Sequence, residues 1–312
     1  MGHSDTSAHH AEHGRSGPVV VGVDGSEAAL RAVTWAAHEA RLRHAALRIV
    51  HAIGIPDFFP GGAISPSTEL FHLLERDADA ALADARELAE RVGGGIVVGT
   101  ETLTDSPVVS LIDESARARC VVLGESGRGA FAGALLGSTT ITLAAHARCP
   151  VVAVRGPGER VQANTVVVGV DGSELSDDAL GCAFEQAAFR GARLVAVRAT
   201  GDGDTGEPGA RSPVPSGGEP PDGTEHRVLA ECLAGWAERY PDVEVQRDVA
   251  RAKPRQRLLD WSDSADLVVV GCRGRGGFRG MLLGSTSQAL LHHATCPVMV
   301  VRRHCATVPQ GV

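Results

Sequence analysis

The chain has 312 residues, of which 43% are hydrophobic, and a formal net charge of −8. A length of this order suggests about two domains. The acidic balance argues against non-specific binding to nucleic acid, and no apolar run reaches the ~18 residues of a membrane-spanning helix. The first 17 residues are polar, rich in histidine and without the apolar core of a secretory signal, so we expect a disordered tail on a cytoplasmic protein.

The seven cysteines are odd in number and form no Cys-x-x-Cys pair, which favours reduced cytosolic thiols. Cys149 and Cys296 precede equivalent prolines and are expected to be buried in the packing. Cys272 lies inside a glycine-rich stretch, where a reactive thiol is the alternative.

In the first half of the chain, expected strands alternate with expected helices. Residues 19–23 are Val-Val-Val-Gly-Val, and a continuous apolar strand is typical of a parallel sheet covered on both faces. Ser26 then caps a helix whose apolar residues follow the helical period. The remaining strands are expected at 47–52, 96–103, 120–123 and 150–154, and the remaining helices at 67–91, from Ser106-Pro107 and from Ser138.

The second half repeats the first at a constant separation of 147 positions, as Asp24 with Asp171 and Gly124 with Gly271 show. Such a separation indicates an internal duplication. Residues 201–223 are dense in Gly, Pro, Asp and Ser and are expected to form a surface loop. The elements after this loop are expected as helix 225–240, strand 243–249, helix 254–263 and strands 265–270 and 297–301.

This alternation predicts an α/β protein with two tandem doubly wound domains, each built on a five-stranded parallel sheet. The expected boundaries are a tail at 1–17, domains at 18–157 and 165–303, a linker at 158–164 and a second tail at 304–312. Ligands of such sheets bind beyond the carboxyl ends of the strands, near the point where strand order reverses.

One glycine motif occurs in both halves, with the spacing Gly, two residues, Gly, nine residues, Gly-Ser. It follows an apolar strand and precedes a helix in each copy, which predicts a phosphate-binding loop, because glycine lets the backbone approach an anion and the first helical N–H groups point at it. Ser138 and Ser285 are the expected N-caps. The motif is not a P-loop, because no Gly-Lys-Ser/Thr follows, and a dinucleotide fingerprint would follow the first strand instead.

Asp24 and Asp171 end the first strands of the two halves and have two interpretations. One is an Asx turn that leads into a capped helix, and the other is a carboxylate that faces a ribose hydroxyl or a Mg²⁺ ion; the two are compatible with each other. No Ser-His-Asp or paired-carboxylate arrangement repeats in both halves, which lowers the odds of hydrolytic chemistry.

Val-x-Val-Asp-Gly-Ser-Glu, the glycine motif and the Cys-Pro-Val-x-Val-Val-Arg of the second copy together resemble the universal stress protein family in its tandem, two-domain form. The resemblance covers about residues 18–155 and 165–302. It implies an adenine-nucleotide-binding fold, so ATP, together with Mg²⁺, is the expected ligand. Ser126 departs from the family, which often has Arg or His there.

Site residues carry over from the family position by position. The resemblance assigns the adenine to the ends of the first two strands, which are Gly22, Val23, Asp24 and Ala52, and Gly169, Val170, Asp171 and Ala199. It assigns the ribose and phosphates to the motif and the following helix, which are Gly124, Ser126, Gly127, Gly137, Ser138, Thr139 and Thr140, and Gly271, Arg273, Gly274, Gly284, Ser285, Thr286 and Ser287.

The leading hypothesis is a cytoplasmic ATP-binding stress regulator without fast turnover that acts on unidentified protein partners. A slow ATPase or phosphotransferase, or an interaction module that needs no nucleotide, are the alternatives. We expect the second site to hold phosphates more tightly, since Arg273 replaces Ser126 and Glu125 has no acidic counterpart. The last strands, 151–154 and 298–301, are apolar sheet edges, and such an edge needs a partner. The resemblance implies that the two strands pair within the chain as a pseudo-twofold dimer, and homodimers of such chains are a further possibility to which no specific residue points.

Overall fold

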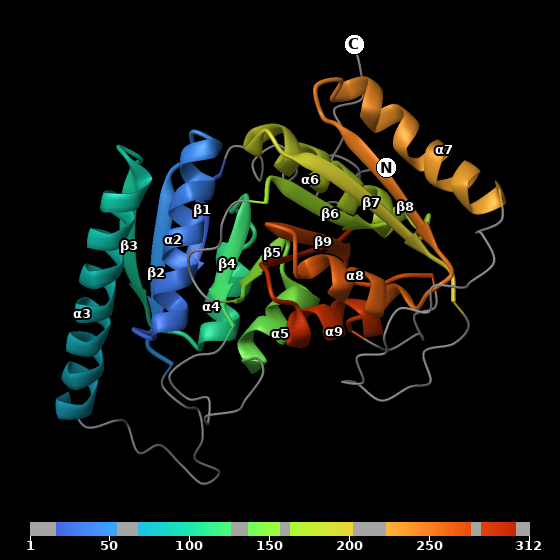
Figure 1. Ribbon diagram of the computed structural model, residues 1–312. Helices are drawn as coiled ribbons and strands as arrows, with labels where there is room; N and C mark the ends of the chain where they lie inside the picture. Colours follow the sequence, from blue (N-terminus) through green and yellow to red (C-terminus); the bar gives the residue numbers. More distant parts are fainter. Residues whose placement is uncertain are drawn as a thin grey trace, which may run out of the picture. The chain divides into compact units, whose positions relative to one another are not determined.

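A computed structural model describes residues 17–54, 68–125, 137–156, 163–201, 223–275 and 282–303. The chain divides into two units, Met1–Val154 and Arg155–Val312. Each unit contains a parallel sheet of five strands with helices on both faces, so the expected fold class is confirmed (Figure 1). No helix within these described ranges is long and apolar enough to cross a membrane.

The sheet of the first unit has the strand order β3-β2-β1-β4-β5. Its central strand β1 pairs with β2 on one side and with β4 on the other, so strand order reverses at β1. Helix α2 packs with α3, and α4 packs with α5. The bounds are β1 Val19–Gly22, α2 Glu27–Leu42, β2 Leu47–Ala52, α3 Thr68–Gly93, β3 Val98–Leu103, α4 Pro107–Glu114, β4 Cys120–Gly124, α5 Ser138–His146 and β5 Val151–Val154.

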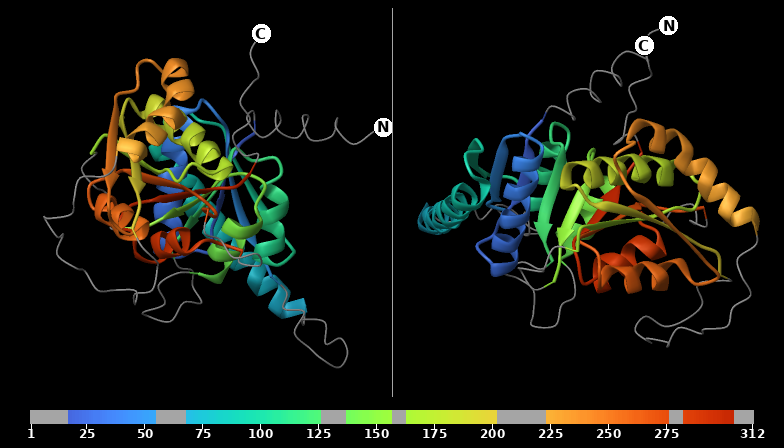
Figure 2. Two further views of the ribbon diagram at one scale, coloured as in Figure 1. Left: turned by 90° about the vertical axis from the view of Figure 1, so that its right-hand side faces the viewer. Right: turned by 45° about the horizontal axis from the view of Figure 1, so that its top comes forward.

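The sheet of the second unit has the matching order β8-β7-β6-β9-β10, with β6 at the reversal point. Helices α6 and α7 lie on one face, and α8 and α9 lie on the other (Figure 2). The bounds are β6 Thr165–Gly169, α6 Glu174–Arg190, β7 Arg193–Ala199, α7 Gly223–Arg239, β8 Val245–Ala250, α8 Pro254–Ser262, β9 Leu267–Gly271, α9 Ser285–His293 and β10 Val298–Val301.

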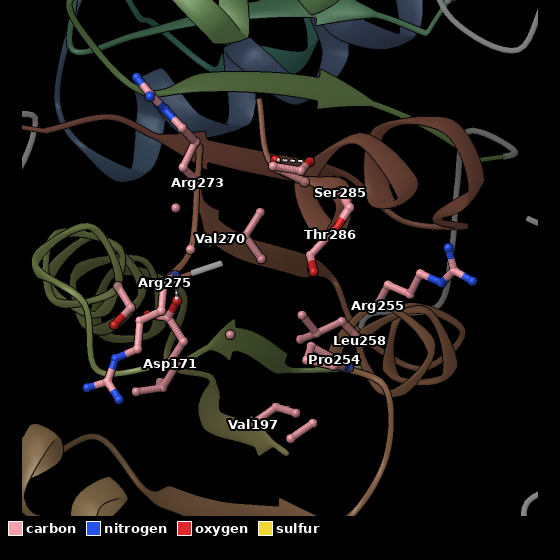
Figure 3. A pocket seen from close by; sticks show the side chains of 18 of the residues that line it. Asp171, Val197, Pro254, Arg255, Leu258, Val270, Arg273, Arg275, Ser285 and Thr286 are labelled. Carbon is pink, nitrogen blue, oxygen red and sulfur yellow. Dashed lines mark hydrogen bonds between the residues drawn. The ribbon is translucent and has the colours of Figure 1, made fainter. Parts of the chain in front are cut away.

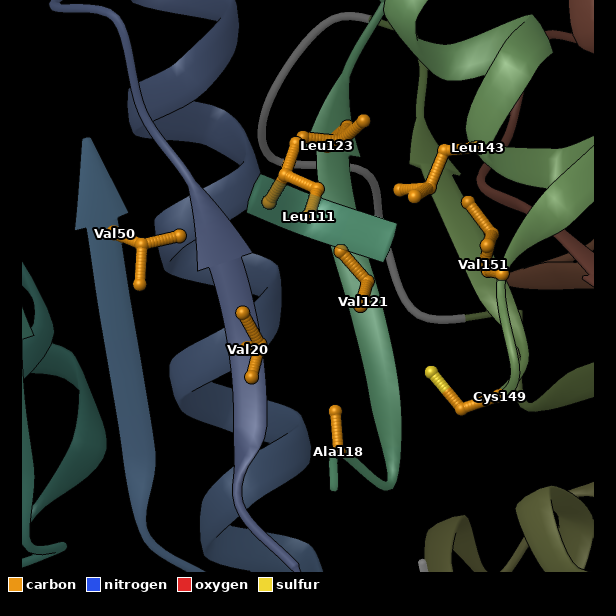
Figure 4. Packing of buried hydrophobic residues seen from close by; sticks show 10 residues of the cluster. Val20, Val50, Leu111, Ala118, Val121, Leu123, Leu143, Cys149 and Val151 are labelled. Carbon is orange, nitrogen blue, oxygen red and sulfur yellow. The ribbon is translucent and has the colours of Figure 1, made fainter. Parts of the chain in front are cut away.

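The core of the first unit consists of small aliphatic side chains. Val20, Val121 and Val151 from the sheet pack with Leu111 of α4 and Leu143 of α5 (Figure 4). All of them are at most 4% exposed, and small side chains of this kind let the helices approach the sheet closely. The sequence analysis predicted burial for Cys149 and Cys296, and both are buried.

Several element boundaries differ from the sequence-based expectation. Helix α3 runs two residues further, to Gly93, because the turn begins only at Gly94, where φ is +60°. Gly95 has φ +94°, so the chain becomes extended at Val98 rather than at residue 96. In the second unit, α7 begins at Gly223 instead of residue 225, and β8 spans Val245–Ala250 instead of residues 243–249.

Candidate functional site

A pocket of about 670 Å³ opens in the second unit at the carboxyl ends of its strands (Figure 3). Every residue predicted for the second site lines this one pocket. They come from the end of β6, the end of β7, the end of β9 and the start of α9, and are Gly169, Val170, Asp171, Ala199, Gly271, Arg273, Gly274, Gly284, Ser285, Thr286 and Ser287.

Asp171 forms an Asx turn at the start of α6. Its Oδ1 accepts hydrogen bonds from the N–H of Ser173 at 2.9 Å and from the Ser173 hydroxyl at 2.6 Å. Ser173 Oγ in turn accepts from the N–H of Ser176 at 3.3 Å and so caps the helix. In the first unit, Asp24 and Ser26 form the same turn, with distances of 3.0 and 2.7 Å. The geometry therefore supports the Asx-turn interpretation in both copies.

The second carboxylate oxygen of Asp171 holds the glycine loop. Asp171 Oδ2 accepts from the backbone N–H of Arg275 at 2.8 Å. Burial alone would raise the pKa of Asp171, but the hydrogen bonds from Ser173 and Arg275 outweigh it and lower the pKa below its usual range. The carboxylate is therefore ionised at neutral pH, and N–H and O–H donors engage both of its oxygens.

A metal role for Asp24 or Asp171 stays a prediction. Mg²⁺ is usually held by one or two carboxylates together with waters and substrate phosphates, in near-octahedral geometry. Over the ranges that the structure describes, no three His, Cys, Asp or Glu side chains gather around a common point. A Mg²⁺ ion at either aspartate would therefore take most of its oxygen ligands from phosphate and water.

Arg275 closes the loop over the start of α6. Its guanidinium Nη2 donates to the carbonyl of Gly172 at 2.8 Å, so the side chain is directed at the protein backbone, beside Asp171 (Figure 3). Gly172 has φ +78°, a conformation that favours glycine. A Cβ at Gly274 would lie only 2.6 Å from Asp171 Oδ2. The second glycine of the motif is thus required by the close approach of this loop to Asp171.

The first glycine of the motif serves packing. A Cβ at Gly124 would lie 2.6 Å from the carbonyl carbon and oxygen of Ala28 in α2, and a Cβ at Gly271 would lie 3.1 Å from Leu175 O in α6. In both units, therefore, this glycine lets the helix after the first strand pack against the end of the fourth strand. Helix packing accounts for this part of the repeated motif without any ligand.

The predicted N-caps of α5 and α9 are wrong by one residue. Gly137 and Gly284 are the N-caps, and Ser138 and Ser285 are already the first helical residues. Both glycines have extended backbones, with φ of −70° and −75°, and neither helix start has a side-chain cap. The first N–H groups of such a helix lack partners within the helix and are suited to bind an anion.

Ser287 fixes the start of α9 from inside. Its hydroxyl lies 2.9 Å from the carbonyl oxygen of Gly284 and 3.0 Å from that of Cys272, to which it donates. Gly284 N–H also donates to Cys272 O at 2.8 Å. Ser287 thus positions the backbone that lines the pocket. Cys272 itself is 4% exposed, so the structure gives the alternative of a reactive thiol no support, because reactivity requires access.

Sequence analysis missed the part of the pocket formed by the start of α8. Lys253 and Arg255 line one rim there, and Pro254 and Leu258 lie beside them. The sequence could have placed them there, since Lys253-Pro254 begins three residues after the end of β8, proline marks a helix start, and the carboxyl ends of parallel strands meet at one edge. Apolar side chains complete the wall, namely Val197, Val270 and Leu283.

The first unit places its predicted residues at the equivalent edge. Gly22 ends β1 and is followed by Val23 and Asp24, Ala52 ends β2, and Gly124 ends β4. Gly137, Ser138, Thr139 and Thr140 start α5, and Ser126 and Gly127 lie outside the described residues. Glu125 forms an ion pair with Arg31 Nη2 at 2.9 Å. This partly exposed ion pair offsets part of the negative charge of Glu125.

Two doubly wound α/β units with the same strand order and the same turn chemistry define a tandem, internally duplicated α/β protein. The model of the universal stress protein family matches residues 16–155 and 163–302. The chain therefore belongs to the universal stress protein family, and the predicted resemblance is confirmed.

Relatives agree over nearly the full length. A universal stress protein from Mycolicibacterium smegmatis is 41% identical over 291 residues, which cover 91% of this chain and 96% of the relative. The chain also resembles a crystal structure of a universal stress protein from Archaeoglobus fulgidus DSM 4304, with a TM-score of 0.70 and 21% sequence identity. The match covers 92% of this chain and 99% of that chain, and at this identity it supports the fold only. A universal stress protein solved in complex with cAMP is 30% identical but covers only 45% of this chain, 98% of its own, with a TM-score of 0.34.

Proposed function

We propose that this chain is an ATP-binding stress-response regulator without fast turnover, which holds one nucleotide in the pocket of the second unit and one at the matching edge of the first. The observation that carries the proposal is the convergence of every predicted second-site residue on one pocket of about 670 Å³. Nucleotide-sized ligands bind in concave sites of this order of size, with apolar walls and a few convergent polar groups.

The lining residues divide the pocket by chemistry. The N-terminus of α9, which has no side-chain cap, suits phosphate oxygens. Asp171 Oδ2 accepts one described hydrogen bond, from Arg275, and an ionised carboxylate oxygen accepts two, which suits a ribose hydroxyl. The apolar wall of Val197, Leu258 and Val270 suits a purine base. Where Mg²⁺ accompanies the phosphates, Asp24 and Asp171 are the carboxylates that we propose beside it.

Binding fits this lining better than hydrolysis. The described lining includes no histidine or glutamate, and its one acid, Asp171, has donors on both oxygens. A general base must reach the proton that it removes and have a pKa near the working pH, whereas the pKa of Asp171 is lowered. We therefore favour a nucleotide-controlled regulator over the alternative of a slow ATPase.

Calorimetry with ATP tests the proposal directly. The wild-type chain should bind two equivalents, and Gly274→Val should remove one of them, because its side chain would collide with Asp171 Oδ2. A steady-state phosphate-release assay on the same protein separates regulator from ATPase. Absence of ATP binding by the wild type at millimolar concentration would refute the proposed function.

We further propose that the last strands, β5 and β10, pair within the chain, that the chains associate as homodimers, and that the protein works in the cytoplasm. The six cysteines of the described ranges are all free thiols, which is the usual state in a reducing compartment. Expressing residues 18–157 and 165–303 separately tests the pairing, since each half should then associate with itself. Two halves that stay folded and monomeric at high concentration would contradict it.

A further inference from the structure

The residue at which the second unit begins is bound to the end of α9. Arg155 directly follows Val154, the last residue of β5, in the chain. Its guanidinium donates to three carbonyls there, at 2.6 Å to Leu291 O, 2.9 Å to His292 O and 2.9 Å to Ala294 O. The last carbonyls of a helix lack partners within the helix, so Arg155 serves as the C-terminal cap of α9.

Gly156 continues this contact against the residue that follows α9. It has φ +88°, and a Cβ at this position would collide with Thr295 O, so the position requires glycine. At the same separation of 147 positions, its counterpart is Arg303, which forms an ion pair with Glu174 of α6. The close approach is therefore a feature of the 155–156 segment and not of the repeat.

Thr295 joins the end of α9 to the end of α8, and these two helices pack side by side (Figure 1). Its N–H donates to Ser262 Oγ in the last turn of α8 at 3.2 Å, and its hydroxyl donates to Ser262 O at 2.9 Å. The opposite ends of the same helices line the pocket, with Pro254 and Leu258 from α8 and residues 284–287 at the start of α9. The pocket and the 155–156 segment are thus attached to opposite ends of one pair of helices.

Helix α9 is too short to be stable without contacts at its ends. It has nine residues, which span about 13 Å, and isolated helices below about 12–15 residues are marginal in water. Its N-terminus has no side-chain cap, whereas Arg155 caps its C-terminus. An anion at the N-terminus and a cation at the C-terminus both stabilise a helix through its dipole. Phosphate in the pocket and Arg155 therefore stabilise the same conformation of α9, each from its own end.

We propose that α8 and α9 couple the second nucleotide site to the 155–156 segment, so that bound ATP tightens the hold of α9 on Arg155 and Gly156. The proposal rests on nucleotide binding at this pocket. Coupling between two sites is reciprocal, so Arg155 in turn raises the affinity for ATP by the same factor. Arg155 is a positioning residue in this scheme, because it acts on the nucleotide through α9. The segment at which the two units join then senses whether the second site is occupied.

Calorimetry on a protein that keeps only the second site measures this coupling. In a protein whose first site has been removed by Gly127→Val, Arg155→Ala should lower the ATP affinity about five-fold, at the lower end of typical couplings, because Ser287 still holds the start of α9. Arg155→Lys keeps the charge but loses the planar fork, so it should retain part of the affinity. Arg239→Ala is the matched control: it removes an exposed cation from the last turn of α7, which adds no residue to the described lining, and should leave the affinity unchanged.

Hydrogen exchange gives the reciprocal measurement and needs no change at Arg155. In the Gly127→Val protein, ATP should slow exchange of the Ala294 and Thr295 amides, which donate to Leu290 O and Ser262 Oγ. The Tyr240 amide at the end of α7 donates to Trp236 O and is the reference, where ATP should have less effect. This experiment also decides the question if Arg155→Ala prevents folding.

Unchanged ATP affinity in Arg155→Ala would overturn the coupling, and so would an effect of ATP on the Ala294 and Thr295 amides no larger than that at Tyr240. In either case ATP binding itself would stand. An equal loss of affinity in Arg239→Ala would also overturn the coupling, because it would indicate a general loss of stability. If ATP does not bind the wild type, the proposed function fails, and the coupling fails with it.

Discussion

Gly274 offers the sharpest test of the glycine loop, because a single added carbon has a defined collision. The Cβ of Gly274→Ala would lie 2.6 Å from Asp171 Oδ2, closer than side-chain carbons are found in proteins. Either the loop or the carboxylate must move, and the hydrogen bond from Arg275 N–H to Asp171, now 2.8 Å, is broken. We expect weaker ATP binding at the second site and lower stability of the second unit.

The stability effect follows from that hydrogen bond. A hydrogen bond to a charged group contributes about 1.5–3 kcal/mol, and we take the lower end because Arg275 is exposed. In a unit of about 150 residues, 1 kcal/mol shifts the melting temperature by about 2–4 °C. Gly274→Ala should therefore lower the transition of the second unit by roughly 3–6 °C in scanning calorimetry.

Gly235→Ala is the matched control. Gly235 lies on an exposed face of α7, with no atom within 4 Å of a Cβ built there. Alanine favours a helix over glycine by about 0.5–1 kcal/mol, so this change should leave stability unchanged or raise it slightly, with ATP binding intact. If Gly274→Ala behaves like Gly235→Ala in both assays, contact of the loop with Asp171 does not hold the site together.

Three further predictions follow from the second unit. Asp171→Asn should reduce the free energy of unfolding at pH 7. Because folding lowers the pKa of Asp171, the extra stability of the wild type is complete above about pH 4 and is lost as the pH falls through the lowered pKa. A difference in melting temperature between wild type and variant that stays constant down to about pH 2.5 would contradict this prediction. Arg155→Ala removes a guanidinium that donates to three carbonyls at the end of α9, at 2.6–2.9 Å, and should therefore lower the melting temperature. It should also raise the pKa of His292, because burial, His293 and Arg155 together lower that pKa in the wild type. An NMR titration of His292 measures this change. Arg273→Ser should reduce the ATP affinity of the second site and the salt dependence of that affinity. The measurement is made in a protein whose first site has been removed by Gly127→Val, and unchanged values of both quantities there would rule out a contact between Arg273 and phosphate.

Much of the fold was predictable because its signals are periodic. Continuous apolar strands, helical spacing after capping serines and a constant separation of 147 positions together defined two α/β units. The N-caps of α5 and α9 were predicted at Ser138 and Ser285, one residue after the glycines that hold this position. Glycine and serine are both good N-caps, and the sequence alone does not show which of two adjacent candidates begins the helix.

The roles of individual glycines could not be predicted in the same way. The motif gives no sign that Gly124 and Gly127 have different roles. Position 124 requires glycine because the backbone of Ala28, almost a hundred residues earlier in the chain, lies too close for a side chain there. Such a requirement arises only when a helix packs on the sheet. The start of α8 was missed for a different reason, because Lys253 and Arg255 look like ordinary solvated charges until the sheet edge brings them to the pocket.

Comparing the two halves of the chain separates the residues that the fold needs from those that a ligand can sense. Asp24 and Asp171 make the same kind of Asx turn, and Gly124 and Gly271 each lie close to the backbone of the helix after the first strand, so both copies need these residues whether or not nucleotide binds. Their presence therefore says little about the ligand of either site. Several lining positions differ, because Lys253, Arg255 and Arg273 replace Ser106, Val108 and Ser126, and Ser176 and Ser287 replace Ala29 and Thr140. Since the shared turns and packing cannot distinguish the sites, any difference in nucleotide preference between the halves has to arise at positions that differ, such as these.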